Sequence, residues 1–159
     1  MNLLPSMPED LKPIEELLVS LNFSVKNIVT EKECQEYKGY QIDGNNSKII
    51  YRKSKITPTK KGQFVTVWKR TPAGPIAPFD QNDCIDFVII LSKNSKQSGF
   101  FVFPEKILLE QAIFSTQKKE GKRGFRIYLP FEDLDSKQAI KTQQWQAPFF
   151  VEKTFDGCE

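Results

Sequence analysis

The chain of 159 residues contains no histidine and only three cysteines, and both shortages narrow its chemistry. Without an imidazole, the chain has no base for a serine or cysteine hydrolase triad and no histidine ligand for zinc. Its cysteines, Cys34, Cys84 and Cys158, are odd in number and have no CxxC spacing, which disfavours a disulfide framework and a tetrahedral thiolate metal site. We therefore expect reduced thiols.

Long apolar runs and nucleotide-binding motifs are also missing. No apolar stretch approaches the roughly 20 residues of a membrane-spanning helix. The opening "MNLLPSMPEDLKPIEELL" lacks a basic region and carries acids early, unlike a secretory signal. No Walker loop, GxGxxG, EF-hand or GxSxG sequence is present. We expect a cytoplasmic protein with no membrane partner and no cofactor.

The charge of the chain is small overall but unevenly distributed. The formal net charge is +3, yet residues 1–43 hold eight acids and four lysines, a balance of −4. Residues 44–79 hold eight Lys or Arg residues and no acid, a balance of +8. Such asymmetry indicates a polyanionic partner, although solvated surfaces also produce it.

Hydrophobic periodicity predicts a chain that changes from helix to strands. Helices are expected over about 8–21 and near 31–37. Two strands joined by a turn are expected within 39–56, and further strands over 63–70, 84–91, 100–104 and 124–131. Later helices are expected over 105–114 and about 135–146, followed by an edge strand in the segment 147–153. We predict one domain over 1–159, with a helical segment to about 38, a sheet-containing core from about 39 to 153, and an α/β or α+β sandwich fold.

Two basic stretches are the candidate binding residues. The first is "YRKSKITPTKKGQFVTVWKR", in which a turn precedes a strand and cations stand at both ends of that strand. The second is "EGKRGFRIY", where two glycines bracket a basic tip. Cations here suit phosphate contacts, and Phe64 or Trp68 could offer a stacking surface. Solvated hairpins with no ligand explain the same pattern. The candidates are Lys53, Lys55, Lys60, Lys61, Lys69, Arg70, Lys122, Arg123 and Arg126.

A cluster of acids supports a different hypothesis, a magnesium-dependent nuclease. Asp83 and Asp86 lie just before or at the start of an expected strand, and Glu105 and Lys106 follow another. Carboxylates can hold Mg²⁺ while a lysine positions the attacking water. The same acids also suit helix capping, and Glu105 suits the first turn of a helix.

Several of these stretches together resemble the MepB family. They are "YRKSKITPTKKGQFVTVWKR", "GPIAPFD", "FVFPEKIL", "GKRGFRIYLPF" and "KQAIKTQQWQAPFF", in this order over roughly residues 36–151. The family pattern differs at Phe100, where it tends to have Gln, and at Leu129 to Phe131, where it tends to have Pro-Pro-Trp.

The resemblance implies a three-layer sandwich, a mixed central sheet between helices, similar to restriction endonucleases and Holliday-junction nucleases. Nucleases of this kind carry an acid two residues before a lysine. Val67 in "TVWK" and Pro104 in "FPEK" stand at that position. The resemblance implies a nucleic-acid-binding role, for DNA or RNA. Because the acid is missing at both places, we expect binding without cleavage. A magnesium-dependent nuclease and a module that binds an acidic protein remain alternatives.

Overall fold

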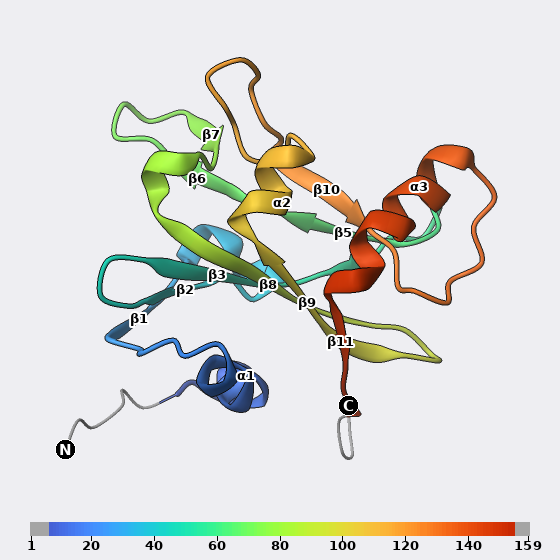
Figure 1. Cartoon of the computed structure of the whole chain (residues 1–159), viewed down its shortest axis with the longest axis horizontal. Coiled ribbons are helices and arrows are strands. Elements are labelled where there is room, and N and C mark those ends of the chain that lie inside the picture. The colour runs from blue at the N-terminus through green and yellow to red at the C-terminus, as the bar shows by residue number, and fades with distance from the viewer. Residues whose placement is uncertain (1–6, 155–159) are drawn as a thin grey trace.

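The centre of the molecule is a six-stranded mixed sheet in a computed structural model that describes residues 7–154 (Figure 1). The strand order is β1-β2-β3-β8-β9-β11. β3 and β8 are parallel, and the other neighbouring strands of this sheet are antiparallel. The mixed α/β architecture expected from the sequence is confirmed. The bounds of these strands are Asn27–Thr30, Tyr40–Asp43, Lys48–Lys53, Ile85–Lys93, Ser98–Pro104 and Phe150–Glu152.

Strand β8 lies in the interior of this sheet because its sequence is apolar on both sides. Val88, Ile89 and Ile90 are all fully buried. Val88 and Ile90 belong to the core on one side of the sheet, and Ile89 to the core on the other. Burial on both sides is what a continuous β-branched run predicts.

The N-terminal helix covers one side of the sheet. It begins as the 3-10 helix η1 (Glu9–Ile14), which includes Pro13, and continues as α1 (Glu15–Ser20). Leu11, Ile14 and Leu18 are buried against the sheet. The helix expected over about 8–21 is therefore confirmed. The second expected helix is also present, as the 3-10 helix η2 (Lys32–Tyr37). Strand β1 lies between the two, within the segment that the sequence predicts to be helical.

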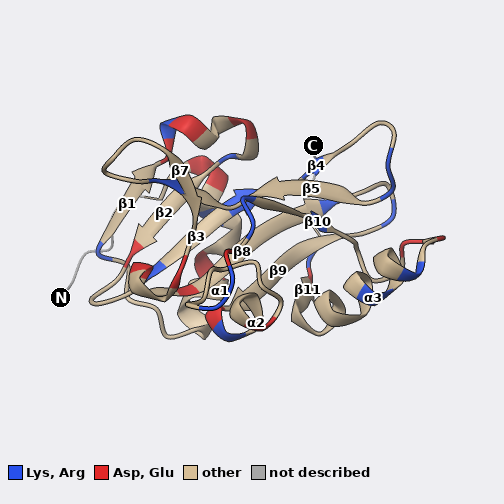
Figure 2. Ribbon diagram, turned by 90° about the horizontal axis from the view of Figure 1, so that it is seen from above, with Lys and Arg blue, Asp and Glu red and all other residues tan. Residues whose placement is uncertain are grey.

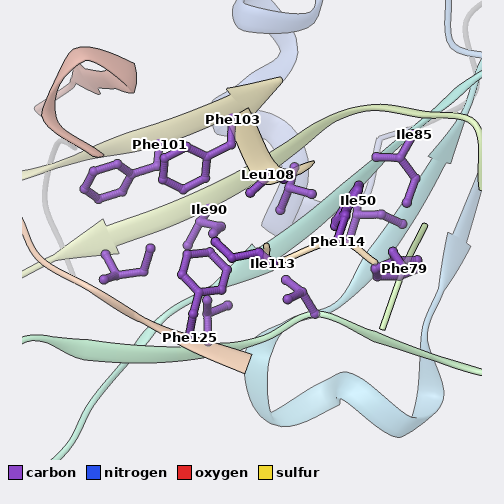
Figure 3. Close-up of a cluster of buried hydrophobic side chains, with 14 of the residues drawn as sticks. Ile50, Phe79, Ile85, Ile90, Phe101, Phe103, Leu108, Ile113, Phe114 and Phe125 are labelled. Atoms are coloured by element: carbon purple, nitrogen blue, oxygen red, sulfur yellow. The ribbon is translucent and has the colours of Figure 1, made fainter. Parts of the chain in front are cut away.

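A second sheet, with two helices, covers the other side. Its strand order is β10-β5-β4, with bounds Gly124–Ile127, Gln63–Thr66 and Lys55–Ile56. The helices α2 (Glu105–Glu110) and α3 (Lys137–Gln146) complete this layer (Figure 1). Phe103 of β9 and Phe125 of β10 point into the core between the sheets, with ring centroids 6.1 Å apart (Figure 3). The sheet is thus flanked by helix on one side and by strands and helices on the other.

The strand expected over 63–70 is divided into two. β5 ends at Thr66, and β6 (Trp68–Arg70) pairs with β7 (Ile76–Pro78) in a separate two-stranded sheet. Between them, the backbone N–H of Val67 donates to the carbonyl of Arg123. The predicted alternation holds across the break, since Val65 and Val67 are both buried. The strand divides because its two halves pair with different partners.

Helix α2 is shorter than the sequence predicts. It ends at Glu110, and Ala112 takes a positive φ of 56°. The turn sends Ile113 and Phe114 into the core, where they are 2% and 0% exposed. Burial of these two side chains therefore ends the expected 105–114 helix early. Helix α3, by contrast, begins as predicted, because Ser136 accepts a hydrogen bond from the Ala139 N–H at 3.0 Å.

Polar side chains are buried between the two sheets. Arg52 is fully buried, and its Nε donates to the carbonyl of Thr66 on β5 at 3.0 Å. Two residues further along the chain, the Ser54 hydroxyl bonds to the side chains of Gln63 and Ser92. Nε and Nη1 of Arg52 thus have hydrogen-bond partners, whereas its Nη2 is buried with no partner among the described residues.

Within residues 7–154, no helix has the length and apolar character needed to cross a membrane. Cys34 is buried and Cys84 is exposed, and both are free thiols. Cys158 lies outside the described residues.

Candidate functional site

An open groove of about 790 Å³ lies between helix α3 and the three-stranded sheet β10-β5-β4, which we call the small sheet. Its lining residues come from four stretches, within residues 60–64, 111–113, 122–128 and 134–145. Among the described residues that line it, five are cationic and one, Asp135, is acidic. We call it the basic groove. Its cations are Lys60, Lys61, Lys122, Arg126 and Lys141.

Folding brings together parts of both predicted basic stretches. Lys60 and Lys61 come from the turn before β5, and Lys122 and Arg126 from β10 and the segment before it. Figure 2 shows the loop between β4 and β5 and helix α3, both with Lys or Arg, at the same end of the molecule. Four of the nine predicted binding residues therefore share one concave surface.

Two of these cations are held in place by the protein itself. Arg126 Nη2 donates to the Thr57 hydroxyl at 2.8 Å and to the Lys61 carbonyl at 2.6 Å. The Lys61 ammonium lies 3.2 Å from Asp135 and donates to the carbonyl of Asp133 at 2.9 Å. These contacts tie the turn before β5 to β10 and to the loop before α3. The charges of the groove are therefore partly pre-positioned, while Lys60, Lys122 and Lys141 are exposed.

The other predicted cations do not line the groove. Lys69 lies 2.8 Å from Asp83 and 3.4 Å from Asp80. Partial burial by itself lowers the pKa of Lys69, but the two carboxylates outweigh that effect and raise it. Lys69 is thus a paired cation at the start of η3 (Gln81–Asp83), where Asp80 and Asp83 form a capping box.

Three more candidates are paired at other places. Arg70 bonds to Glu33 of η2, and this hydrogen bond lowers the pKa of that carboxyl. Arg123 pairs with Glu120 at 2.9 Å, and Lys55 with Glu36 at 3.2 Å. The ninth candidate, Lys53, is half-buried at the end of β3. The predicted basic surface is therefore divided, and only its part near β10 and the turn before β5 lies in the groove.

Helix α3 contributes residues that the sequence interpretation missed. Lys141 and Trp145 line the groove one helical turn apart, together with Gln138 and Thr142. Their spacing of three to four residues places them on one side of a helix. This spacing in the sequence could have identified these residues as one side of the helix. It was overlooked because the helix carries few charges. Gln146 is fully buried instead, and its amide bonds to the backbone of Arg126 in β10 and of Tyr128 just after it.

The acids of the nuclease hypothesis do not form one site. Asp83 is engaged by Lys69, whereas Asp86 is exposed on β8 and Glu105 begins α2. The pKa of Glu105 is raised, mainly by burial and to a smaller extent by the negative charge of Asp86. These two carboxylates are therefore neighbours. Lys106 is exposed beside them. No group of three or more Asp, Glu, Cys or His side chains that could hold a metal occurs among the described residues.

Comparisons with known proteins agree with this fold. The model of the MepB-like family matches residues 31–152, more than half of the chain. A solved structure entitled "Crystal Structure of MepB" matches with a TM-score of 0.75 and 29% sequence identity, covering 94% of this chain and 100% of the other. No curated protein matches with significance. The chain belongs to the MepB-like family.

Proposed function

We propose that this protein binds nucleic acid, DNA or RNA, in the basic groove and does not cleave it. The observation that supports this best is the meeting of five cations from distant parts of the chain in one hollow with a single acid among its described lining residues. Phosphodiester backbones bind such surfaces because each neutralised phosphate releases counterions. A restriction-endonuclease-like use of the scaffold, as a platform for a nucleic-acid backbone, is part of the same proposal.

The arrangement of partners also favours a phosphate ligand for the groove rather than for the β6 region. Lys69 and Arg70 are already paired with carboxylates, so a phosphate would have to compete with Asp83 and Glu33. In the groove, Lys61 is the cation paired with Asp135, and the groove keeps a net excess of positive charge. We therefore assign the binding role to Lys60, Lys61, Lys122, Arg126 and Lys141.

Charge reversal inside and outside the groove tests the proposal. Lys122→Glu and Lys141→Glu together should weaken binding of a labelled oligonucleotide, measured by fluorescence anisotropy, and reduce its salt dependence by about one unit of slope per lost contact. The matched control is Lys118→Glu with Lys119→Glu, two exposed cations that do not line the groove. Equal weakening by both pairs would contradict a specific groove and indicate general attraction.

The nuclease alternative depends on the neighbouring carboxylates of Asp86 and Glu105. The pKa of Glu105 is raised, which is common in active sites but also occurs at structural carboxylates. Incubating labelled DNA and RNA with Mg²⁺ or Mn²⁺ tests it, with Asp86→Ala as the control. Cleavage that Asp86→Ala abolishes would replace our proposal of binding without cutting.

Competition by heparin but not by oligonucleotide would favour an acidic protein partner.

A further inference from the structure

Aromatic side chains line the basic groove beside its cations. Phe64 from β5, Tyr128 after β10 and Trp145 from α3 are each half-buried, so part of each ring remains accessible. Phe125 is 6% exposed and lies deeper, towards the core. The groove therefore combines positive charge with ring surfaces, which a purely electrostatic site does not need.

Two of these rings are held directly against glycines. A Cβ added to Gly124 would lie 2.5 Å from Cζ of Phe64, and one added to Gly62 would lie 2.5 Å from Cε1 of Tyr128. Any larger residue at either glycine would displace the ring. The rings are thus packed against the backbone of the small sheet and its preceding turn, as fixed surfaces rather than free side chains.

Trp145 lies in the opposite wall of the groove, on α3, and its position is also fixed. Its ring centroid lies 5.4 Å from that of Phe103, so the indole is anchored in the core while it lines the groove. Lys141 precedes it by one helical turn and also lines the groove. The α3 wall therefore places a cation and an aromatic surface together, as the small sheet does with Arg126 and Phe64.

From this juxtaposition we infer that the groove takes single-stranded nucleic acid, with bases stacked on its aromatic walls and phosphates on its cations. The inference rests on the proposed function and specifies its ligand. Duplexes are usually read by a helix or ribbon that protrudes into the major groove, and they keep their bases stacked inside. A hollow lined with rings suits unpaired bases, because aromatic platforms in a basic groove are how single strands are bound without sequence preference.

The experiment uses the intrinsic fluorescence of Trp145. The chain has two tryptophans, and Trp68 does not line the groove, so a Trp68→Phe background leaves one reporter at the site. Oligothymidylate and oligouridylate should quench this reporter and bind more tightly than a hairpin duplex with the same number of nucleotides. The first two ligands also separate DNA from RNA. A duplex that binds as tightly as the single strands would overturn the inference.

A second measurement removes one aromatic surface. Phe64→Leu should weaken single-strand binding by about 5- to 100-fold, and Phe64→Tyr should restore it, because stacking needs a ring. Phe131→Leu is the matched control, since Phe131 is 82% exposed and does not line the groove. Thermal unfolding of each variant checks that the fold is kept.

The outcomes separate the inference from the proposal on which it rests. Loss of binding in the Lys122 and Lys141 reversal but not in Phe64→Leu would keep a nucleic-acid groove and overturn base stacking. No binding of single strands or duplex would overturn both.

Discussion

Arg52 is the residue whose role the sequence could least predict. Its alternation pattern places it on the same side of β3 as Ile50 and Ser54, a side that mixes apolar and polar residues. In the fold this side is covered by β5, and Arg52 donates to Glu31 and to the carbonyls of Thr66 and Tyr51. A polar residue in a strand is ordinarily taken as exposed. Its burial here depends on a carboxylate and a carbonyl from distant segments.

Removing the partner of Arg52 should cost more than removing Arg52 itself. Glu31→Ala leaves a fully buried guanidinium without its carboxylate and should lower the free energy of unfolding by about 3–5 kcal/mol. In Arg52→Met, an apolar side chain fills the space of the buried arginine. Glu31, whose side chain is 22% exposed, stays in contact with water. Urea unfolding of both variants measures the difference. A larger loss in Arg52→Met would contradict the argument.

The pKa of Glu105 should depend on the neighbouring carboxylate of Asp86. Burial, the larger cause, and Asp86 raise its pKa, so the folded state holds the proton more tightly than the unfolded state does. This contribution to stability is complete below the ordinary pKa of a glutamate and is lost as the pH rises through the raised value. In Asp86→Asn the pKa of Glu105 should fall but stay above its ordinary value.

Carboxyl ¹³C NMR across the acidic range measures this pKa directly, and thermal unfolding at the same pH values measures its consequence. Asp86→Asn should lose less stability than the wild type between acidic and neutral pH. A pKa of Glu105 that is the same in Asp86→Asn as in the wild type would show that the two carboxylates do not interact.

At the level of elements, the sequence predicted most helices and strands, because their apolar periods are local. It predicted the hairpin of β2 and β3, the strand β8 and the helix α3. It failed where pairing with distant segments decides the structure. The division at Val67 and the early end of α2 depend on partners that no local pattern contains.

The side-chain amide of Gln146 links helix α3 to β10. Gln146 accepts from the Tyr128 N–H at 2.9 Å and donates to the Arg126 carbonyl at 2.8 Å, as a neighbouring strand would. Gln146→Leu should leave both backbone groups unpaired and cost about 1–3 kcal/mol for each. Because Arg126 and α3 both line the groove, oligonucleotide binding should weaken as well.

The control for this prediction is Gln144→Leu, since Gln144 is an exposed residue of the same helix. It should leave both the urea midpoint and oligonucleotide binding nearly unchanged. Equal effects of the two substitutions would mean that the amide of Gln146 does not hold α3 in place.

For the whole molecule, the candidate site depends on how distant cations meet. The two basic stretches contain Lys60, Lys61, Lys122 and Arg126, which the fold brings together in one groove. The charge asymmetry along the chain could not distinguish these from Lys69 and Arg70, because a sequence does not reveal which acids fold beside which cations. In the fold, Lys69 lies beside Asp83, and Arg70 lies beside Glu33.

The number of groove cations sets the salt dependence of binding. If all five contact phosphates, the log–log slope of affinity against salt should be about −3.5 for a single strand and about −4.5 for a duplex. Anisotropy titrations between about 50 and 200 mM salt measure it. An affinity that does not change with salt would exclude phosphate contacts as the main source of binding.

The pairing of β5 with β10 also determines when the groove can exist. Strand β5 is synthesised early, but its partner and then the wall formed by α3 emerge from the ribosome much later. A nascent chain that has reached only β9 would have the turn carrying Lys60 and Lys61, but no opposite wall. The two walls of the groove can therefore meet only after α3 has emerged, when most of the central sheet has already been made.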